Sequence, residues 1–186
     1  MKKHLFVLLM AAMLMLGGCG GSGAVQEEKE NPIATEMQAE LQSYDAELTA
    51  ADAAEAGMFV IEGGKVVGGQ ENWDAFYAGE AESVIICQFS LEGGAMLDYV
   101  AEQTDGSYVV VSDLTRDGYD FAEKEDYKIQ EFKHIKVFEE FRVQEGGTAY
   151  TVCVMTDDEN LDAATFLSYW QELSYEENGA FMLFVI

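Results

Sequence analysis

An apolar segment at the start of the chain decides which residues are available for folding. Two lysines and a histidine precede an unbroken apolar run from Leu5 to Leu16, and small residues follow it. This order is typical of a secretory signal peptide. The run is short for a permanent membrane helix, which needs about 20 apolar residues. We therefore expect residues 1–18 to be a signal peptide that is removed.

The end of this segment, Leu16-Gly17-Gly18-Cys19, resembles the lipobox of bacterial lipoproteins. In that motif the cysteine is acylated on its sulfur, and cleavage falls just before it. The resemblance implies that Cys19 carries a lipid and holds the protein at the extracytoplasmic face of the bacterial cell membrane. More than one acyl chain on a residue is sufficient for stable anchoring. The alternative is a plain secretory signal followed by a chance cysteine.

The charge of the remaining chain limits its partners. Two of the 10 Lys and Arg residues lie before residue 18, so 8 basic residues face 35 acidic ones, a formal charge of −27. Such a surface repels polyanions, which excludes nucleic acid, and attracts cations or a cationic cell-envelope partner. The simpler explanation is that the charge only keeps the protein dispersed.

Residues 19–48 are predicted to be a flexible tether between the lipid and the domain. Residues 20–23 are three glycines and a serine, and the acidic residues after them favour a solvated segment. After Pro32, apolar residues recur every three or four positions from Met37 to Leu48. Part of the tether is therefore expected to be helical, either packed on the domain or free in solution.

Residues 49–186 are predicted to form one globular domain of the α+β class, an antiparallel or mixed β-sheet with two amphipathic helices packed on it. A short helix capped by Thr49 and ended by Gly57 begins it. Aromatic-bearing helices are expected at 70–79 and 160–173, and strands at 58–61, 65–67, 83–89, 96–101, 108–111, 135–143, 148–155 and 181–186. The turn Asp105-Gly106 predicts that the strands over 83–111 form an antiparallel meander. The apolar last strand is expected to be paired inside a sheet.

Two turns resemble those of an uncharacterised family of short lipoproteins from Gram-positive bacteria. They are Ser90-Leu91-Glu92-Gly93 and Thr115-Arg116-Asp117. The resemblance covers roughly residues 49–155 and implies the same order of helices and strands. It implies no catalytic residue, because none is known for the family.

Few residues are candidates for catalysis or metal binding. His134 is the one histidine left after residue 18, and no His-x-x-x-His, Cys-x-x-Cys or Gly-x-Ser-x-Gly motif is present. The acidic run from Asp157 to Asp162 lacks the spacing and the glycine of a calcium loop, and acids are favoured before a helix. Neither catalytic residues nor metal ligands nor cofactors are predicted. A catalytic triad through His134 is left open but unsupported.

The basic residues and the remaining cysteines have structural explanations. Five basic residues lie between Lys124 and Arg142. They are typical of an edge strand in which lysines prevent pairing with strands of other molecules. The alternative is a patch that binds an anionic headgroup or wall polymer. Cys87 and Cys153 lie in apolar strands and are predicted to be buried and unpaired.

The sequence leaves two functions open for the protein. The preferred one is a non-catalytic binding or sensing module at the cell surface. The alternative is a small cell-envelope hydrolase that uses carboxylates. A deep cleft with converging acids would favour the hydrolase.

Overall fold

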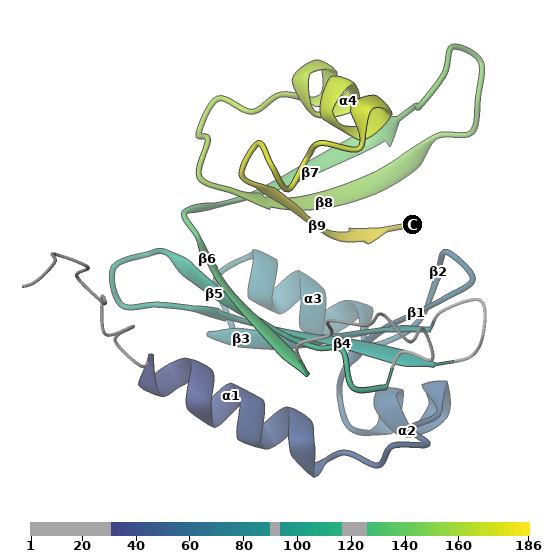
Figure 1. Cartoon of the computed structure of the whole chain (residues 1–186). Helices are drawn as coiled ribbons and strands as arrows, with labels where there is room; N and C mark the ends of the chain where they lie inside the picture. The colour runs from purple at the N-terminus through teal and green to yellow at the C-terminus, as the bar shows by residue number, and fades with distance from the viewer. Residues whose placement is uncertain (1–30, 90–93, 117–125) are drawn as a thin grey trace, which may run out of the picture.

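The computed structural model describes residues 31–89, 94–116 and 126–186 (Figure 1). Within them the chain has the predicted α+β fold, with a six-stranded mixed sheet, a three-stranded antiparallel sheet and four helices. The predicted signal peptide, Cys19, the turn at 90–93, Asp117 and Lys124 lie outside the described residues.

The helices are α1 (Pro32–Ser43), α2 (Ala50–Glu55), α3 (Gln70–Tyr77) and α4 (Ala163–Glu172). The larger sheet has the order β2-β1-β3-β4-β5-β6, and its strands are β1 (Phe59–Glu62), β2 (Lys65–Gly68), β3 (Ser83–Phe89), β4 (Ala95–Glu102), β5 (Tyr108–Asp113) and β6 (Tyr127–Phe132). The smaller sheet has the order β7-β8-β9, formed by β7 (His134–Phe141), β8 (Tyr150–Thr156) and β9 (Ala180–Val185). Only β1 and β3 pair in parallel among these strands, and β3-β4-β5 is the predicted meander.

These elements stack in layers (Figure 1). Helices α1 and α2 cover one face of the six-stranded sheet, the three-stranded sheet and α3 lie against the other, and α4 covers the far side of the smaller sheet. Successive side chains of a strand point to opposite faces. In β3, Ile85 and Cys87 therefore pack toward α1 and α2, whereas Val84 and Ile86 pack between the sheets. The continuous apolar run of β3 reflects this burial on both faces.

Helix α1 is part of the packed structure, so the tether predicted over residues 19–48 extends too far. Asn31 caps the helix by accepting a hydrogen bond from the backbone N–H of Ile33, and its side-chain amide donates to Glu131 Oε1 of β6 at 2.8 Å. The inward stripe of α1, which includes Met37 and Leu41, is buried against β4 and β5. The apolar periodicity was correctly recognised as helical, and the structure shows that this face packs on the domain.

Two glycines with positive φ angles form the turns after α2 and before α3. Gly57 has a φ of +81° after α2, as predicted from its position behind the helix. Gly69 precedes α3 with a φ of +66°, and a Cβ atom there would lie 1.9 Å from the carbonyl oxygen of Met58. A larger residue at position 69 would therefore push β1 away from α3. Asn72, the third residue of α3, donates a hydrogen bond to the carbonyl oxygen of Gly57 at 2.9 Å.

Helix α4 differs from its prediction at both ends. The helix was predicted over 160–173, but its N-cap is Asp162, whose carboxylate accepts a hydrogen bond from the N–H of Thr165 at 2.8 Å. The helix ends at Glu172, and Leu173, the last residue of the predicted range, is 82% exposed. The buried face is formed by Phe166, with Trp170 beside it.

The last strand, β9, is apolar for a reason that differs from the prediction. Among the strands that the structure describes, it pairs only with β8 and so forms an edge of the smaller sheet. Its side chains are buried because the smaller sheet packs on the larger one. The ring of Phe184 lies 4.9 Å from that of Trp73 and 5.2 Å from that of Phe59, measured between centroids.

Strand β6 was not predicted. It is the edge strand of the larger sheet, and Ile129 within it is 49% exposed, so its residues show little apolar periodicity. After β6 the chain crosses at Lys133 into β7, an edge strand of the smaller sheet. The predicted edge strand over 135–143 is therefore confirmed as β7. The basic residues are spread more widely than predicted, because β7 contains one lysine, Lys136, and Lys128 lies in β6.

Cys87 and Cys153 are buried and unpaired, as predicted. The Cys87 side chain packs beneath α1 and α2, whereas that of Cys153 packs between the two sheets. The six-stranded sheet therefore separates the two thiols. Burial raises the pKa of the Cys87 thiol to about 12 and that of Cys153 still further, so both behave as small apolar side chains rather than nucleophiles.

Candidate functional site

A cavity of about 480 Å³ lies between the two sheets. Its floor is formed by β3, β4, β5 and β6, and its opposite wall by β9 and the turn before it. Apolar side chains of β9 and Met96 of β4 form much of the lining, and the polar residues that border the cavity are Gln88, Asp98, Ser112, Asp113, Lys128 and Glu176. A concave, largely apolar space of this size with a few polar groups is typical of small-molecule sites.

Asp98 is the buried acid of this cavity. It lies in the middle of β4, between Ile86 of β3 and Ser112 of β5, and only 7% of it is exposed. The Ser112 hydroxyl donates a hydrogen bond to Asp98 Oδ1 at 2.5 Å, and the Gln88 side chain is a second hydrogen-bond partner. Among the described residues Asp98 forms no salt bridge.

Burial has a clear electrostatic effect on this group. Loss of hydration raises the pKa of Asp98 from 3.8 to about 6, while the hydrogen bonds from Ser112 and Gln88 and the positive charge of Lys128 lower it without cancelling the effect. The carboxyl group is thus mainly ionised at neutral pH. A buried ion without a contacting counterion is energetically costly.

Gln88 connects the floor of the cavity to its opposite wall. Its side-chain nitrogen donates a hydrogen bond to the backbone carbonyl of Leu183 at 2.9 Å, although the two residues are far apart in the sequence. The amide group of glutamine has two donor hydrogens. Gln88 can therefore hold β9 and bind the Asp98 carboxylate at the same time.

Lys128 and Glu176 lie on the exposed side of the cavity. The Lys128 Nζ atom is 3.3 Å from Glu176 Oε2 and 5.9 Å from the centroid of the Phe181 ring. The side chains of Lys128 and Glu176 are 36% and 57% exposed. This ion pair holds the lysine charge at the rim, away from direct contact with Asp98.

Asp113 also borders the cavity, but its carboxylate has other partners. It follows Ser112 in β5, so its side chain points to the opposite face of the sheet. Its Oδ1 atom accepts hydrogen bonds from the backbone and hydroxyl of Thr115 at 2.9 and 2.6 Å, and its Oδ2 atom lies 3.0 Å from Arg116 Nε. Asp98 and Asp113 therefore do not form a converging pair of free carboxylates.

Arg116 joins Asp113 to the end of α1. Its guanidinium donates to the carbonyl oxygens of Leu41 at 3.1 Å, Tyr44 at 2.8 Å and Asp45. The last carbonyls of a helix have no partner within the helix, so a cation with several donors satisfies them well. The Thr115-Arg116 part of the turn noted in the sequence is thus a structural contact that anchors α1.

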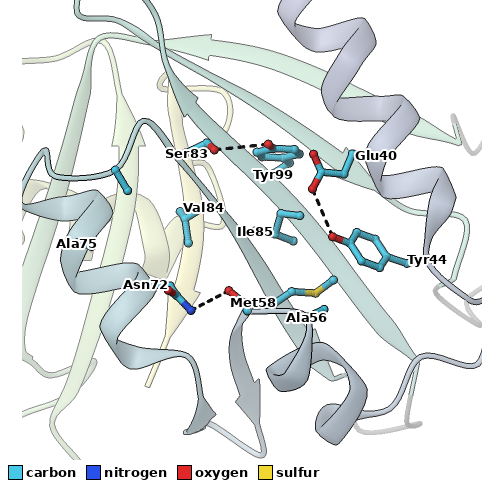
Figure 2. A pocket seen from close by; sticks show the side chains of 12 residues that line it. Glu40, Tyr44, Ala56, Met58, Asn72, Ala75, Ser83, Val84, Ile85 and Tyr99 are labelled. Carbon is cyan, nitrogen blue, oxygen red and sulfur yellow. Dashed lines mark hydrogen bonds between the residues drawn. The ribbon is translucent and has the colours of Figure 1, made fainter.

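A second hollow, of about 210 Å³, lies beside the start of β3 and is bordered by residues of α1 and α3 and by the residues that follow α2 (Figure 2). Its polar side chains are paired with one another or with the backbone. Tyr44 donates to Glu40 Oε1 at 3.4 Å, the hydroxyl groups of Ser83 and Tyr99 are 3.4 Å apart, and Asn72 donates to the backbone (Figure 2). The cavity at Asp98 is the stronger candidate, because it alone of the two contains a buried carboxylate.

The other residues considered from the sequence lie elsewhere. His134 begins β7 and borders a shallow pocket with Tyr77 and Tyr108, in which neither a serine nor a cysteine is present. Asp157 accepts a hydrogen bond from the N–H of Lys133 at 3.1 Å, and Asp158 accepts one from that of Asn160 at 2.8 Å. No group of three or more His, Cys, Asp or Glu residues within the described ranges is arranged to hold a metal ion.

None of the protein-family models, curated proteins or solved structures compared with this chain matches it. Among the described residues, no helix combines the length and the apolar character needed to cross a bilayer.

Asp98 was not selected from the sequence, because acidic residues are so numerous in this chain that none stood out. A local signal does exist. Asp98 interrupts the otherwise apolar strand Ala95–Glu102, and Ser112 ends a run of three valines in the neighbouring strand. A charged residue in the interior of an apolar strand is uncommon unless it has a partner or a role.

Proposed function

We propose that this protein is a lipid-anchored, extracytoplasmic binding module, held at the bacterial cell membrane through Cys19, and that it binds a small molecule in the cavity between its sheets. The observation that carries the binding role is the Asp98 carboxylate, which is buried in a largely apolar cavity and is contacted by no cation of the described residues. Perturbed ionisable groups in such cavities are concentrated at functional sites.

Catalysis by carboxylates is less well supported. A glycosidase-type mechanism needs two carboxyl groups on either side of the scissile bond, with complementary protonation states. Besides Asp98, the acids among the described residues that border the cavity are Asp113 and Glu176. Asp113 is held by Arg116 on the opposite face of the sheet, and Glu176 is paired with Lys128. Their positions favour binding over hydrolysis.

Binding in the cavity is tested with a neutral apolar fluorophore. We expect N-phenyl-1-naphthylamine to bind the Cys19→Ser protein, which needs no detergent, saturably and at one site. Met96→Trp places an indole in the cavity and is expected to weaken binding by about tenfold or more, as measured by fluorescence titration. The control is Val67→Trp, which adds the same ring at a side chain that is 50% exposed and distant from the lining. Absence of saturable binding, or equal binding by Met96→Trp, would overturn the proposal.

Anchoring is tested at Cys19 itself. The Cys19→Ser protein is expected to leave the membrane fraction, because serine offers no thiol for acylation and a single polar side chain does not hold a protein at a bilayer. Fractionation followed by immunoblotting measures this, with Ser22→Ala as the control that stays in the membrane. A Cys19→Ser protein that is processed before residue 19 and still sediments with membranes would contradict the anchor.

A further inference from the structure

We infer that the cavity between the sheets selects apolar molecules that carry a protonated amine, with Asp98 as the residue that binds the amine. This inference rests on the proposed function, because it assumes that the cavity is a ligand site. It adds the chemical class of the ligand.

The first step concerns the unused capacity of the carboxylate. An ionised carboxylate has about four acceptor positions. Within residues 31–89, 94–116 and 126–186, the hydrogen-bond partners of Asp98 are the hydroxyl of Ser112 and the amide of Gln88, both of which are neutral. An ammonium group would supply both further donors and the missing positive charge, and such charge-assisted hydrogen bonds are stronger than neutral ones.

The second step concerns the cation that the protein itself offers. Lys128 lies opposite Ser112 in the sheet and, among the residues that the structure describes, is the one cationic residue that lines the cavity. Its Nζ atom is engaged by Glu176 at the rim, 3.3 Å away, and lies over the Phe181 ring. The remaining charged residue that borders the cavity is Asp113, and its side chain contacts Arg116 on the opposite face of the sheet. No cation from the described part of the chain therefore contacts Asp98, and a ligand can provide one.

The third step concerns the body of the ligand. Phe181, Leu183 and Phe184 of β9 contribute to the wall across from Asp98, and Met96 lies beside it on the floor. These side chains offer dispersion contacts to an aliphatic or aromatic group but few hydrogen bonds to a sugar or peptide. The strongly negative surface of the chain also draws cations toward the site and disfavours anionic ligands of the same shape.

The experiment compares three probes with the same alkyl chain. We expect n-octylamine to displace N-phenyl-1-naphthylamine from the Cys19→Ser protein about ten- to a hundredfold more effectively than 1-octanol at pH 7.5, with octanoate the weakest. Asp98→Asn, made in the Cys19→Ser protein, should bring the amine to the level of the alcohol while leaving the alcohol unchanged. Glu139→Gln, which removes one exposed charge from β7, should preserve the preference.

The outcomes separate the two proposals. If the fluorophore binds but octanol displaces it as well as octylamine, the ligand class is wrong and the cavity remains a binding site. If Asp98→Asn keeps the amine preference, Asp98 is not the group that recognises it, and the inference fails. If the fluorophore does not bind at all, the proposed function itself is overturned. Circular dichroism of each variant establishes that it is folded.

Discussion

Replacement of Arg116 by alanine is expected to lower the free energy of unfolding by about 3–5 kcal/mol. The Arg116 side chain is 6% exposed and that of Asp113 is fully buried, so removing the guanidinium leaves an uncompensated carboxylate in the interior. It also removes one hydrogen-bond donor from each of the carbonyls of Leu41, Tyr44 and Asp45. Urea denaturation followed by circular dichroism measures the loss.

A matched control is available in the same chain. Arg142 pairs with Glu140 at 2.9 Å, but their side chains are 44% and 78% exposed, so Arg142→Ala is expected to change stability by less than about 1 kcal/mol. Arg116→Lys is expected to recover only part of the loss, because a single ammonium cannot reach Asp113 and several carbonyls at once. An Arg116→Ala protein as stable as Arg142→Ala would contradict the anchoring role.

Asp98→Asn is expected to stabilise the protein at neutral pH, by up to about 3 kcal/mol. The pKa of Asp98 is about 6 in the folded state against an ordinary value of 3.8, and a pKa difference of one corresponds to about 1.4 kcal/mol. Between these two values the folded state keeps a proton that the unfolded state has released. Stability is therefore highest below about pH 4, falls as pH rises to about 6, and is then constant with respect to this group.

Chemical denaturation at pH 4, 5, 6 and 7 measures this dependence. Asparagine keeps the shape and an acceptor for Ser112 but does not ionise, so the Asp98→Asn protein should lose less stability over this range than the parent. Repulsion among the acidic residues also lowers stability as pH rises. Glu139→Gln removes one exposed charge, so its pH profile measures how much a single surface carboxylate contributes to that repulsion. Equal pH profiles for Asp98→Asn and Glu139→Gln would show that burial of Asp98 does not destabilise the ionised form.

Local sequence patterns predicted the elements better than their assembly. The apolar run of β3, the Asp105-Gly106 hairpin and the Thr49 cap each depend on neighbouring residues, and all three are present in the structure. The docking of α1 depends instead on contacts such as that between Leu41 and Arg116, which are 75 residues apart. Strand β6 was missed because an edge strand with an exposed isoleucine needs no regular apolar pattern.

The candidate site was less accessible to sequence reasoning than the fold. Its cavity exists because β9 packs across β3, and one of the contacts between them joins Gln88 to Leu183, 95 residues away. No local pattern specifies that the meander and the last strand face each other. The acid that matters could be recognised only after its burial was known, because burial is what distinguishes Asp98 from the many other carboxylates in the chain.

The attachment of α1 has a mechanical consequence in the proposed anchored state. A force pulling the domain away from the membrane would enter the described structure at α1, the first element after the lipid-bearing end. The helix is held near its start by Asn31, bonded to Glu131, and near its end by Arg116, bonded to Asp113. Because Glu131 and Asp113 belong to the adjacent strands β6 and β5, tension on the anchor would be shared across the six-stranded sheet rather than peeling the helix away from one end.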